Sequence, residues 1–167
     1  MIFCALFAAI LCVLAPLSIP LGPIPLSLAT FVIYMAASVL GWKLGGVTVI
    51  LYITIGAIGL PVFSGFAGGF QKLAGVTGGY IIGYIPCALA TGFVIEKSGE
   101  RLWSYPLGMA IGTILLYTLG TVWFSVQTGN GIAAALLICV VPFLIGDSLK
   151  IVAATIVAPQ VRKLVNL

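Results

Sequence analysis

The sequence predicts an all-α integral membrane protein with six transmembrane helices. Of its 167 residues, 62% are hydrophobic and 6% are charged, and the mean hydropathy is +1.32. A soluble domain is about 25% charged. Charge-free runs cover residues 1–42, 44–71 and 73–95, and each exceeds the ~20 residues that cross a bilayer as a helix. These runs lack the alternating apolar and polar residues of a membrane-spanning strand.

Proline, glycine and short polar segments separate the predicted helices. Prolines between residues 16 and 25 end the first helix, because proline lacks an amide donor and clashes with the preceding turn. Glycines within 41–46 divide the second helix from the third, and Gly59 and Pro61 end the third. Polar connections cover 96–104 and 127–131. The predicted helices are 2–18, 26–42, 44–60, 78–97, 105–125 and 132–161.

The connection between the third and fourth predicted helices has an unusual composition for a loop. Residues 61–77 are apolar, aromatic and rich in glycine. Free backbone at membrane depth needs protein partners for its hydrogen bonds. We therefore predict a re-entrant or lid-like loop that caps a cavity. A tight structural hairpin is the alternative.

Small residues recur at helical spacing in several predicted helices. Such stripes let helices approach closely, and we expect packing to be the main role of the glycines. The alanine stripe on the first helix is suited to packing within the fold or against another membrane protein. The stripes are Gly75, Gly79 and Gly83, then Gly108 and Gly112, and finally Ala5 and Ala9.

The basic residues predict the orientation in the membrane. If the N-terminus is cytoplasmic, the positive-inside rule is satisfied, because Lys72 is then the one basic residue in an outer connection. Both termini are therefore expected in the cytoplasm. The net charge of +4 is explained by orientation rather than by nucleic-acid binding. The inner basic residues are then Lys43, Lys97, Arg101, Arg162 and Lys163.

Several classes of chemistry are excluded by missing residue types. The chain has no histidine and no GxxxxGK[ST] loop, which excludes Ser–His or Cys–His nucleophiles and a Walker ATP site. A paired-aspartate protease needs a second intramembrane carboxylate. The four cysteines are expected to be buried hydrophobes, because they lie in apolar runs without a CxxC. We expect neither an enzyme nor a metal site.

Two charged residues, Asp147 and Lys150, interrupt the otherwise uncharged region between residues 102 and 161. An ionisable side chain at the bilayer centre costs at least ~2.5–3.5 kcal/mol on insertion scales. The i, i+3 spacing places both on one helix face, which must look into the bundle. Pro142, five residues before Asp147, is expected to bend this helix. We interpret the pair as a binding site for a polar solute. A purely structural ion pair and a stand-alone carrier with Asp147 as its proton site are the alternatives.

Four ordered motifs resemble those of a known family. Residues 142–150 read PFLIGDSLK and resemble the PF-x-x-GD-x-x-K signature of the BioY family, the biotin-binding S components of energy-coupling factor (ECF) transporters. GLPVF at 59–63, GVTGGY at 75–80 and YTLGTVW at 117–123 resemble three further family segments. The resemblance extends over roughly residues 16–159. PLSLA at 25–29 lacks a glutamine that the family often has, so another small vitamin is the alternative ligand.

The resemblance implies a single transmembrane substrate-binding domain over residues 1–167, in the plasma membrane of a prokaryote. It implies no cofactor and no ATPase in this chain. The implied partners are a vitamin, the lipid bilayer, a transmembrane T component and two ABC-type ATPases that bind the ATP. Docking to the T component is carried over to Ala5 and Ala9. Nucleic acid is not an expected partner.

For biotin, Asp147 is expected to accept hydrogen bonds from the ureido N–H groups and Lys150 to donate to the ureido carbonyl. Because this pair is neutral, the ligand carboxylate needs another cation, and we assign Lys72 to it. The alternative places Lys150 on the carboxylate. Other expected ligand contacts are Phe63, Ser64, Phe66, Gly68, Gly69, Tyr80 and Trp123.

Overall fold

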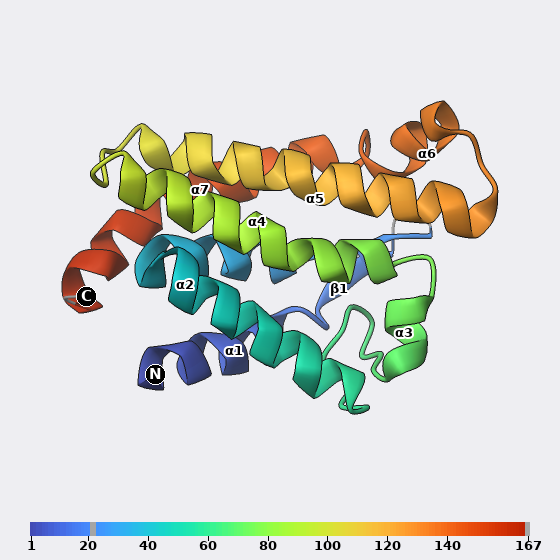
Figure 1. The fold of residues 1–167 in the computed structure, drawn as a ribbon, viewed down its shortest axis with the longest axis horizontal. Helices are drawn as coiled ribbons and strands as arrows, with labels where there is room; N and C mark the ends of the chain where they lie inside the picture. The colour runs from blue at the N-terminus through green and yellow to red at the C-terminus, as the bar shows by residue number, and fades with distance from the viewer. Residues whose placement is uncertain (21–22, 166–167) are drawn as a thin grey trace.

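A computed structural model describes residues 1–20 and 23–165. In this part of the chain, seven helices accompany one small antiparallel sheet (Figure 1). The helices are α1 (Ile2–Leu14), α2 (Ala29–Ala57), α3 (Phe70–Ala74), α4 (Gly78–Lys97), α5 (Ser104–Thr128), α6 (Ile132–Cys139) and α7 (Phe143–Val165). The strands are β1 (Ser18–Pro20) and β2 (Pro25–Ser27).

The predicted class, a helical multi-pass membrane protein, is confirmed. Four helices, α2, α4, α5 and α7, are long and apolar enough to cross a membrane. Helix α1 has 13 residues and rises about 20 Å, less than the ~30 Å of a hydrocarbon core. The prediction of six spanning helices is not confirmed, because four helices in the described part of the chain have the length and hydropathy to cross a membrane. The observed elements also differ from the predicted ones at three places.

The first difference lies in α2, which is broken at Gly41. This residue has a φ of 82° and a ψ of 176°, which only glycine adopts without strain. A Cβ atom added to Gly45 would lie 2.8 Å from the Cα atom of Ala37. Residues eight apart in a straight helix are separated by about 12 Å, so the chain doubles back after the break. The predicted helices 26–42 and 44–60 therefore correspond to two stretches of α2, 29–40 and 42–57.

Charged side chains cap both sides of this break. The Trp42 amide donates to Glu96 Oε1 at 3.3 Å, and Arg162 Nη1 donates to the Ser38 carbonyl at 2.6 Å. Helix geometry would otherwise pair the Ser38 carbonyl with the Trp42 amide. Each charge also complements the dipole of the helix end that it caps. Glu100 forms an ion pair with Arg162 and so fixes the guanidinium from its other side.

The second difference is the sheet between α1 and α2. Helix α1 ends at Leu14, before Pro16, whereas the first helix was predicted to continue to residue 18. The following residues form strands in which Ser18 pairs with Ser27 and Pro20 with Pro25. Sequence analysis did not predict these strands, because the proline-rich run has the composition of a loop. Proline is tolerated at the ends of such short edge strands.

The third difference lies at Pro142, which does more than bend the last predicted helix. The helix predicted over 132–161 is interrupted between Cys139 and Phe143, which gives α6 and α7. Proline at this position removes one amide donor and clashes with the preceding turn. Asp147 consequently lies in the second turn of a new helix rather than in the middle of a long one.

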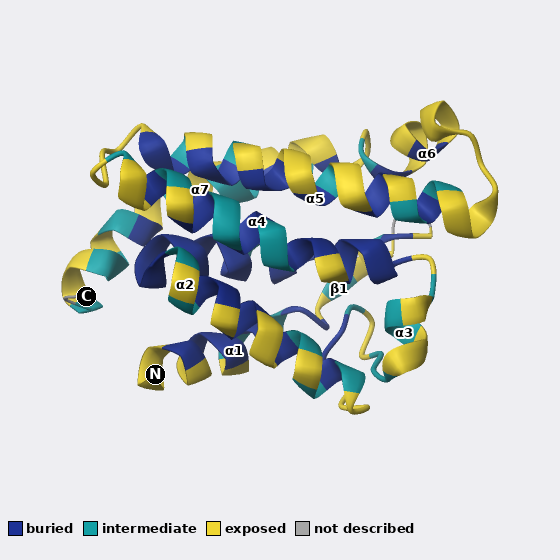
Figure 2. Cartoon of the chain, in the orientation of Figure 1, coloured by how far each residue is buried: buried dark blue, intermediate teal, exposed yellow. Residues whose placement is uncertain are grey.

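Glycines bring α4 and α5 together, as their spacing predicts. A Cβ atom on Gly79 would lie 2.2 Å from Trp123 Cβ, and one on Gly112 would lie 2.5 Å from Thr91 Oγ1. Figure 2 shows buried residues where α2, α4 and α5 face one another, with exposed residues along the outer faces. The stripe residues at the α4–α5 interface are Gly79, Gly83, Gly108 and Gly112.

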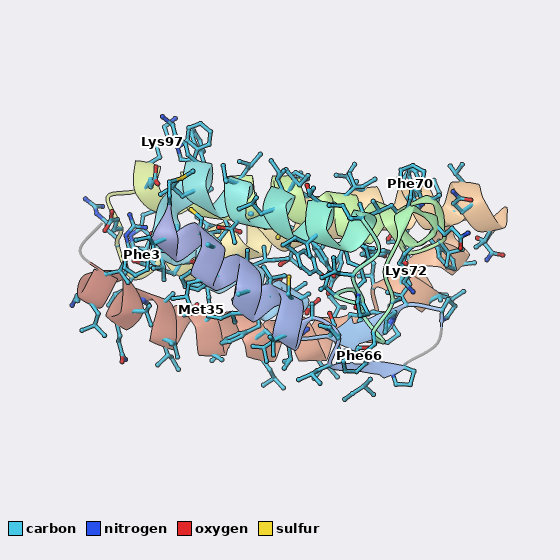
Figure 3. All side chains as sticks on the ribbon, turned by 90° about the horizontal axis from the view of Figure 1, so that it is seen from below. Phe3, Met35, Phe66, Phe70, Lys72 and Lys97 are labelled. Atoms are coloured by element: carbon cyan, nitrogen blue, oxygen red, sulfur yellow. The ribbon has the colours of Figure 1, made fainter. Side chains whose placement is uncertain are left out.

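The two ends of the bundle carry different helices and different basic residues. Figure 1 shows both termini at the left end, whereas α3 and α6 lie at the right end. Figure 3 shows Lys97 and Lys72 near opposite ends of the long axis. Arg162 and Lys163 occupy the last turn of α7, close to the C-terminus. The predicted separation of inner basic residues from Lys72 therefore agrees with the arrangement of the helices.

Candidate binding site

Asp147 is buried, Lys150 is partly buried, and their charges are paired. Lys150 Nζ lies 2.8 Å from Asp147 Oδ1, and the side chains of Asp147 and Lys150 are 7% and 12% exposed. Both residues belong to α7, one turn apart, and they face the bundle as their spacing predicts. Buried ions require a partner and further hydrogen bonds to offset their loss of hydration.

Hydrogen bonds from three other elements complete the surroundings of the pair. Lys150 Nζ donates to the Ser27 carbonyl at 2.6 Å and to Thr30 Oγ1 at 3.0 Å. Thr30 Oγ1 donates to Asp147 Oδ1 at 3.1 Å, and the Tyr117 hydroxyl donates to Asp147 Oδ2 at 2.6 Å. Each of the three N–H donors of Lys150 thus has an acceptor. We call Ser27, Thr30, Tyr117, Asp147 and Lys150 the polar cluster.

Two members of the polar cluster, Ser27 and Thr30, were not predicted as site residues, and Tyr117 entered only as part of a motif. Thr30 is 117 positions from Asp147, so no local spacing relates them. One usable signal was present, because Thr30 is a hydroxyl in an otherwise apolar stretch. Ser27 contributes its backbone carbonyl oxygen. Every residue type has this group, so the residue type at position 27 could not indicate the role.

Replacing Tyr117 by phenylalanine tests the cluster. The change removes a hydrogen bond to a charged acceptor, and we expect a loss of about 1.5–3 kcal/mol in the free energy of unfolding. Thermal unfolding in detergent measures the effect. Tyr105→Phe on the same helix is the matched control, because the Tyr105 hydroxyl has no hydrogen-bond partner within residues 1–20 and 23–165. Equal melting temperatures for the two variants would contradict the assignment.

A small cavity of about 20 Å³ lies beneath the 61–77 segment. It has room for about one water molecule, so a vitamin requires its walls to move. Three predicted ligand contacts, Ser64, Lys72 and Tyr80, meet at this cavity. Its full lining is Pro25, Ser64, Lys72, Thr77, Tyr80, Ile81 and Tyr84.

A larger, more open cavity of about 440 Å³ reaches Lys150. Strand β2 contributes to both cavities, since Pro25 lines the small one and Ser27 lines the large one. The small sheet therefore separates the surroundings of Lys72 from those of Lys150. The lining of the large cavity is Leu17, Ser18, Ile19, Leu26, Ser27, Leu28 and Lys150.

The 61–77 segment is a short hairpin followed by α3. Phe63 and Ala67 form an isolated antiparallel bridge, which matches the tight-hairpin alternative, and Ser64 and Lys72 cover the small cavity. A re-entrant path is not confirmed. Hydrogen bonds fasten the segment to its neighbours: Gly65 amide to Pro16 carbonyl, Gly69 amide to Gly56 carbonyl, Tyr52 hydroxyl to Val62 carbonyl, and Trp123 Nε1 to Gly75 carbonyl.

Five predicted ligand contacts do not line the small cavity, and four of them belong to the 61–77 segment. The Phe63 ring is 1% exposed and packs edge-on against Tyr52, with centroids 5.6 Å apart. Phe66 is 66% exposed. A Cβ atom on Gly68 would lie 2.2 Å from the Leu60 carbonyl oxygen, and Gly69 has a φ of 90°. Trp123, predicted as an aromatic wall, instead holds the Gly75 carbonyl at 2.9 Å.

The two alanines carried over as a docking surface lie on the outward side of α1. Ala5 and Ala9 are exposed, whereas Cys4, Phe7 and Leu11 are buried against the rest of the bundle. This placement leaves the alanines accessible to another membrane helix. Their docking role stays a prediction.

Comparisons with known proteins agree with the motifs. The family model described as the BioY family matches residues 1–167. The chain is 40% identical over 159 residues to the biotin transporter BioY of Thermotoga maritima, covering 95% of this chain and 93% of that protein. It is 37% identical to the probable biotin transporter BioY of Pyrococcus horikoshii, with the same coverage.

The fold also agrees with a solved structure. A crystal structure of the S-component for biotin from an ECF-type ABC transporter superposes with a TM-score of 0.91 at 28% identity. The match covers 97% of this chain and 89% of that chain. The family resemblance of the four motifs is therefore confirmed, and the chain belongs to the BioY family.

Proposed function

We propose that this chain is the biotin-binding S component of an ECF-type ABC transporter. In this role it is a substrate-binding membrane subunit and not an enzyme. The observation that carries the proposal is the buried Asp147–Lys150 pair, hydrogen-bonded within the PF-x-x-GD-x-x-K stretch. Curated relatives that match nearly the whole chain are named as biotin transporters, which supports biotin as the substrate.

The polar cluster has the donors and acceptors that a ureido ring requires. Within the described residues Asp147 Oδ1 already accepts from two groups, whereas Oδ2 accepts from Tyr117 alone. Oδ2 is therefore the better acceptor for a ureido N–H. Lys150 has no spare N–H, so the ureido carbonyl must replace one of its acceptors. The Ser27 carbonyl on β2 is the acceptor that we expect to be exchanged.

The carboxylate of biotin is assigned to Lys72. This lysine lines the cavity next to Tyr80 and Ser64, and it forms no ion pair with any residue in 1–20 or 23–165. Lys150, by contrast, is already neutralised by Asp147. In this arrangement the ligand extends from the polar cluster to the 61–77 segment.

Replacing Lys72 by alanine tests this assignment. We expect the affinity for biotin to fall about 10- to 100-fold, because a charge-assisted hydrogen bond is lost, while the affinity for biotin amide changes little. Titration calorimetry with both ligands measures the preference for the free acid. Lys163→Ala, an exposed lysine at the opposite end of the molecule, is the control. If Lys72→Ala keeps the full preference, Lys150 holds the carboxylate instead.

The proposed topology has six membrane crossings, with stretches 29–40 and 42–57 of α2 as separate crossings and both termini in the cytoplasm. The proposed partners are a T component, which contacts Ala5 and Ala9, and two ATPase subunits. No cofactor is required in this chain. Co-purification with these subunits and ATP-dependent biotin uptake test the proposal. Proton-driven uptake by the chain alone would favour a stand-alone carrier, and mass spectrometry of the co-purified ligand separates biotin from another vitamin.

A further inference from the structure

Two lysines and two aromatic residues form a row across α2 and α4, away from the polar cluster. Lys43 Nζ lies 5.4 Å from the centre of the Trp42 ring, and Lys97 Nζ lies 5.5 Å from the centre of the Phe93 ring. The two rings meet edge-on, with centroids 6.4 Å apart. The rings thus hold one ammonium group on each helix, and we call these four residues the Lys43–Lys97 row.

The ammonium groups of this row are available to an external anion. The ion pairs in the described parts of the chain are Asp147–Lys150 and Glu100–Arg162, and neither includes Lys43 or Lys97. The neighbouring carboxylate, Glu96, directs Oε1 to the Trp42 amide. Both lysines are exposed.

One apolar stripe leads from the row along the exposed side of the second stretch of α2, residues 42–57. The two helices pack closely, since a Cβ atom on Gly92 would lie 2.5 Å from the Trp42 amide nitrogen. The adjacent exposed residues run toward the opposite end of the bundle. They are Val47, Ile50 and Leu51 on α2, Ile58 directly after it, and the single residue Ile82 on α4.

We propose that the Lys43–Lys97 row binds the headgroup of an anionic phospholipid. Two ammonium groups at the end of an apolar stripe match an amphiphile with a negative headgroup and hydrocarbon chains. Tryptophan and lysine are the residues that favour the membrane interface, tryptophan through its amphipathic ring and lysine through an apolar stem with a charged tip. An acidic peptide would also pair with the lysines, but it would leave the α2 stripe without an apolar partner.

Lipid-dependent quenching of Trp42 fluorescence tests the proposal. The protein is reconstituted in phosphatidylcholine vesicles that contain either brominated phosphatidylglycerol or brominated phosphatidylcholine at the same bromine content. The signal of Trp42 is the difference between the unaltered chain and Trp42→Phe. We expect stronger quenching by the anionic lipid. In Lys43→Gln/Lys97→Gln its association relative to phosphatidylcholine should fall about 10- to 30-fold, as two interfacial lysines imply.

The control is Lys163→Gln, which removes an exposed lysine near the same end and should retain the preference for anionic lipid. Biotin binding by the double variant reports that the chain is folded, since neither lysine belongs to the polar cluster. Equal quenching by both lipids, or an unchanged preference in the double variant, overturns the proposal. So does displacement of the lipid by inorganic phosphate or a poly-glutamate peptide at matched ionic strength, which would indicate a site for a free anion or an acidic protein.

Discussion

Replacing Asp147 by asparagine is expected to lower biotin affinity at least about 100-fold and to destabilise the protein. The neutral amide leaves the partly buried Lys150 ammonium without a counter-ion, and breaking a fully buried ion pair costs about 3–5 kcal/mol, which is the upper bound here. Both oxygens of the Asp147 carboxylate accept hydrogen bonds. The asparagine amide has only one oxygen, so the donors at the other position lose their acceptor. Titration calorimetry and thermal unfolding in detergent measure the two effects.

A double variant separates recognition from stability. In Asp147→Asn/Lys150→Met no unpaired charge remains, and replacing a whole buried ion pair by apolar or neutral groups is often neutral or stabilising. We therefore expect the melting temperature to recover while biotin binding does not. Thr30→Ser, which keeps the hydroxyl of the polar cluster, is the conservative control. If the double variant binds biotin as tightly as the unaltered chain, the ligand site does not include Asp147.

Replacing Gly41 by alanine is expected to cost about 2–4 kcal/mol in the free energy of unfolding. Its φ of 82° and ψ of 176° lie in a region that is costly for residues with a Cβ atom, and the added methyl would displace the Glu96 carboxylate from the Trp42 amide. The melting temperature in detergent should fall by on the order of 10 °C.

Two further variants isolate the causes of this loss. Gly59→Ala introduces the same methyl at a φ of 118° with no atom within 4 Å, so it reports backbone strain alone. In Gly41→Ala/Glu96→Ala the displaced carboxylate is absent, and we expect the combined loss to be smaller than the sum of the two single losses. A Gly41→Ala variant as stable as the unaltered chain would show that the break tolerates a side chain.

The sequence predicted the parts of this molecule that depend on local pattern. Long uncharged runs gave the membrane helices, and the i, i+3 spacing of Asp147 and Lys150 placed them on one buried face. The glycine stripes gave the α4–α5 interface. In each case the feature is determined by residues that are close together in the sequence.

The features that sequence analysis missed depend on contacts between distant residues. Thr30 joins the polar cluster across 117 positions, and Arg162 reaches the Ser38 carbonyl across 124. The roles of Ser27 and Ser38 are carried by backbone oxygens, which any residue type possesses. Phe63 was expected at the ligand because it is aromatic and near a loop, but its ring fits against Gly56 and Tyr52 in the core.

The cap on Ser38 has a mechanical consequence. Arg162 joins the end of α7 to stretch 29–40 of α2 at Ser38, and Lys150 joins the same two segments at Thr30. These two contacts lie at different positions along the helix axes, so the two segments cannot tilt independently of each other. Movements that admit or release a ligand must then occur in the sheet, in the 61–77 segment or in the other helices, while this pair serves as the fixed wall.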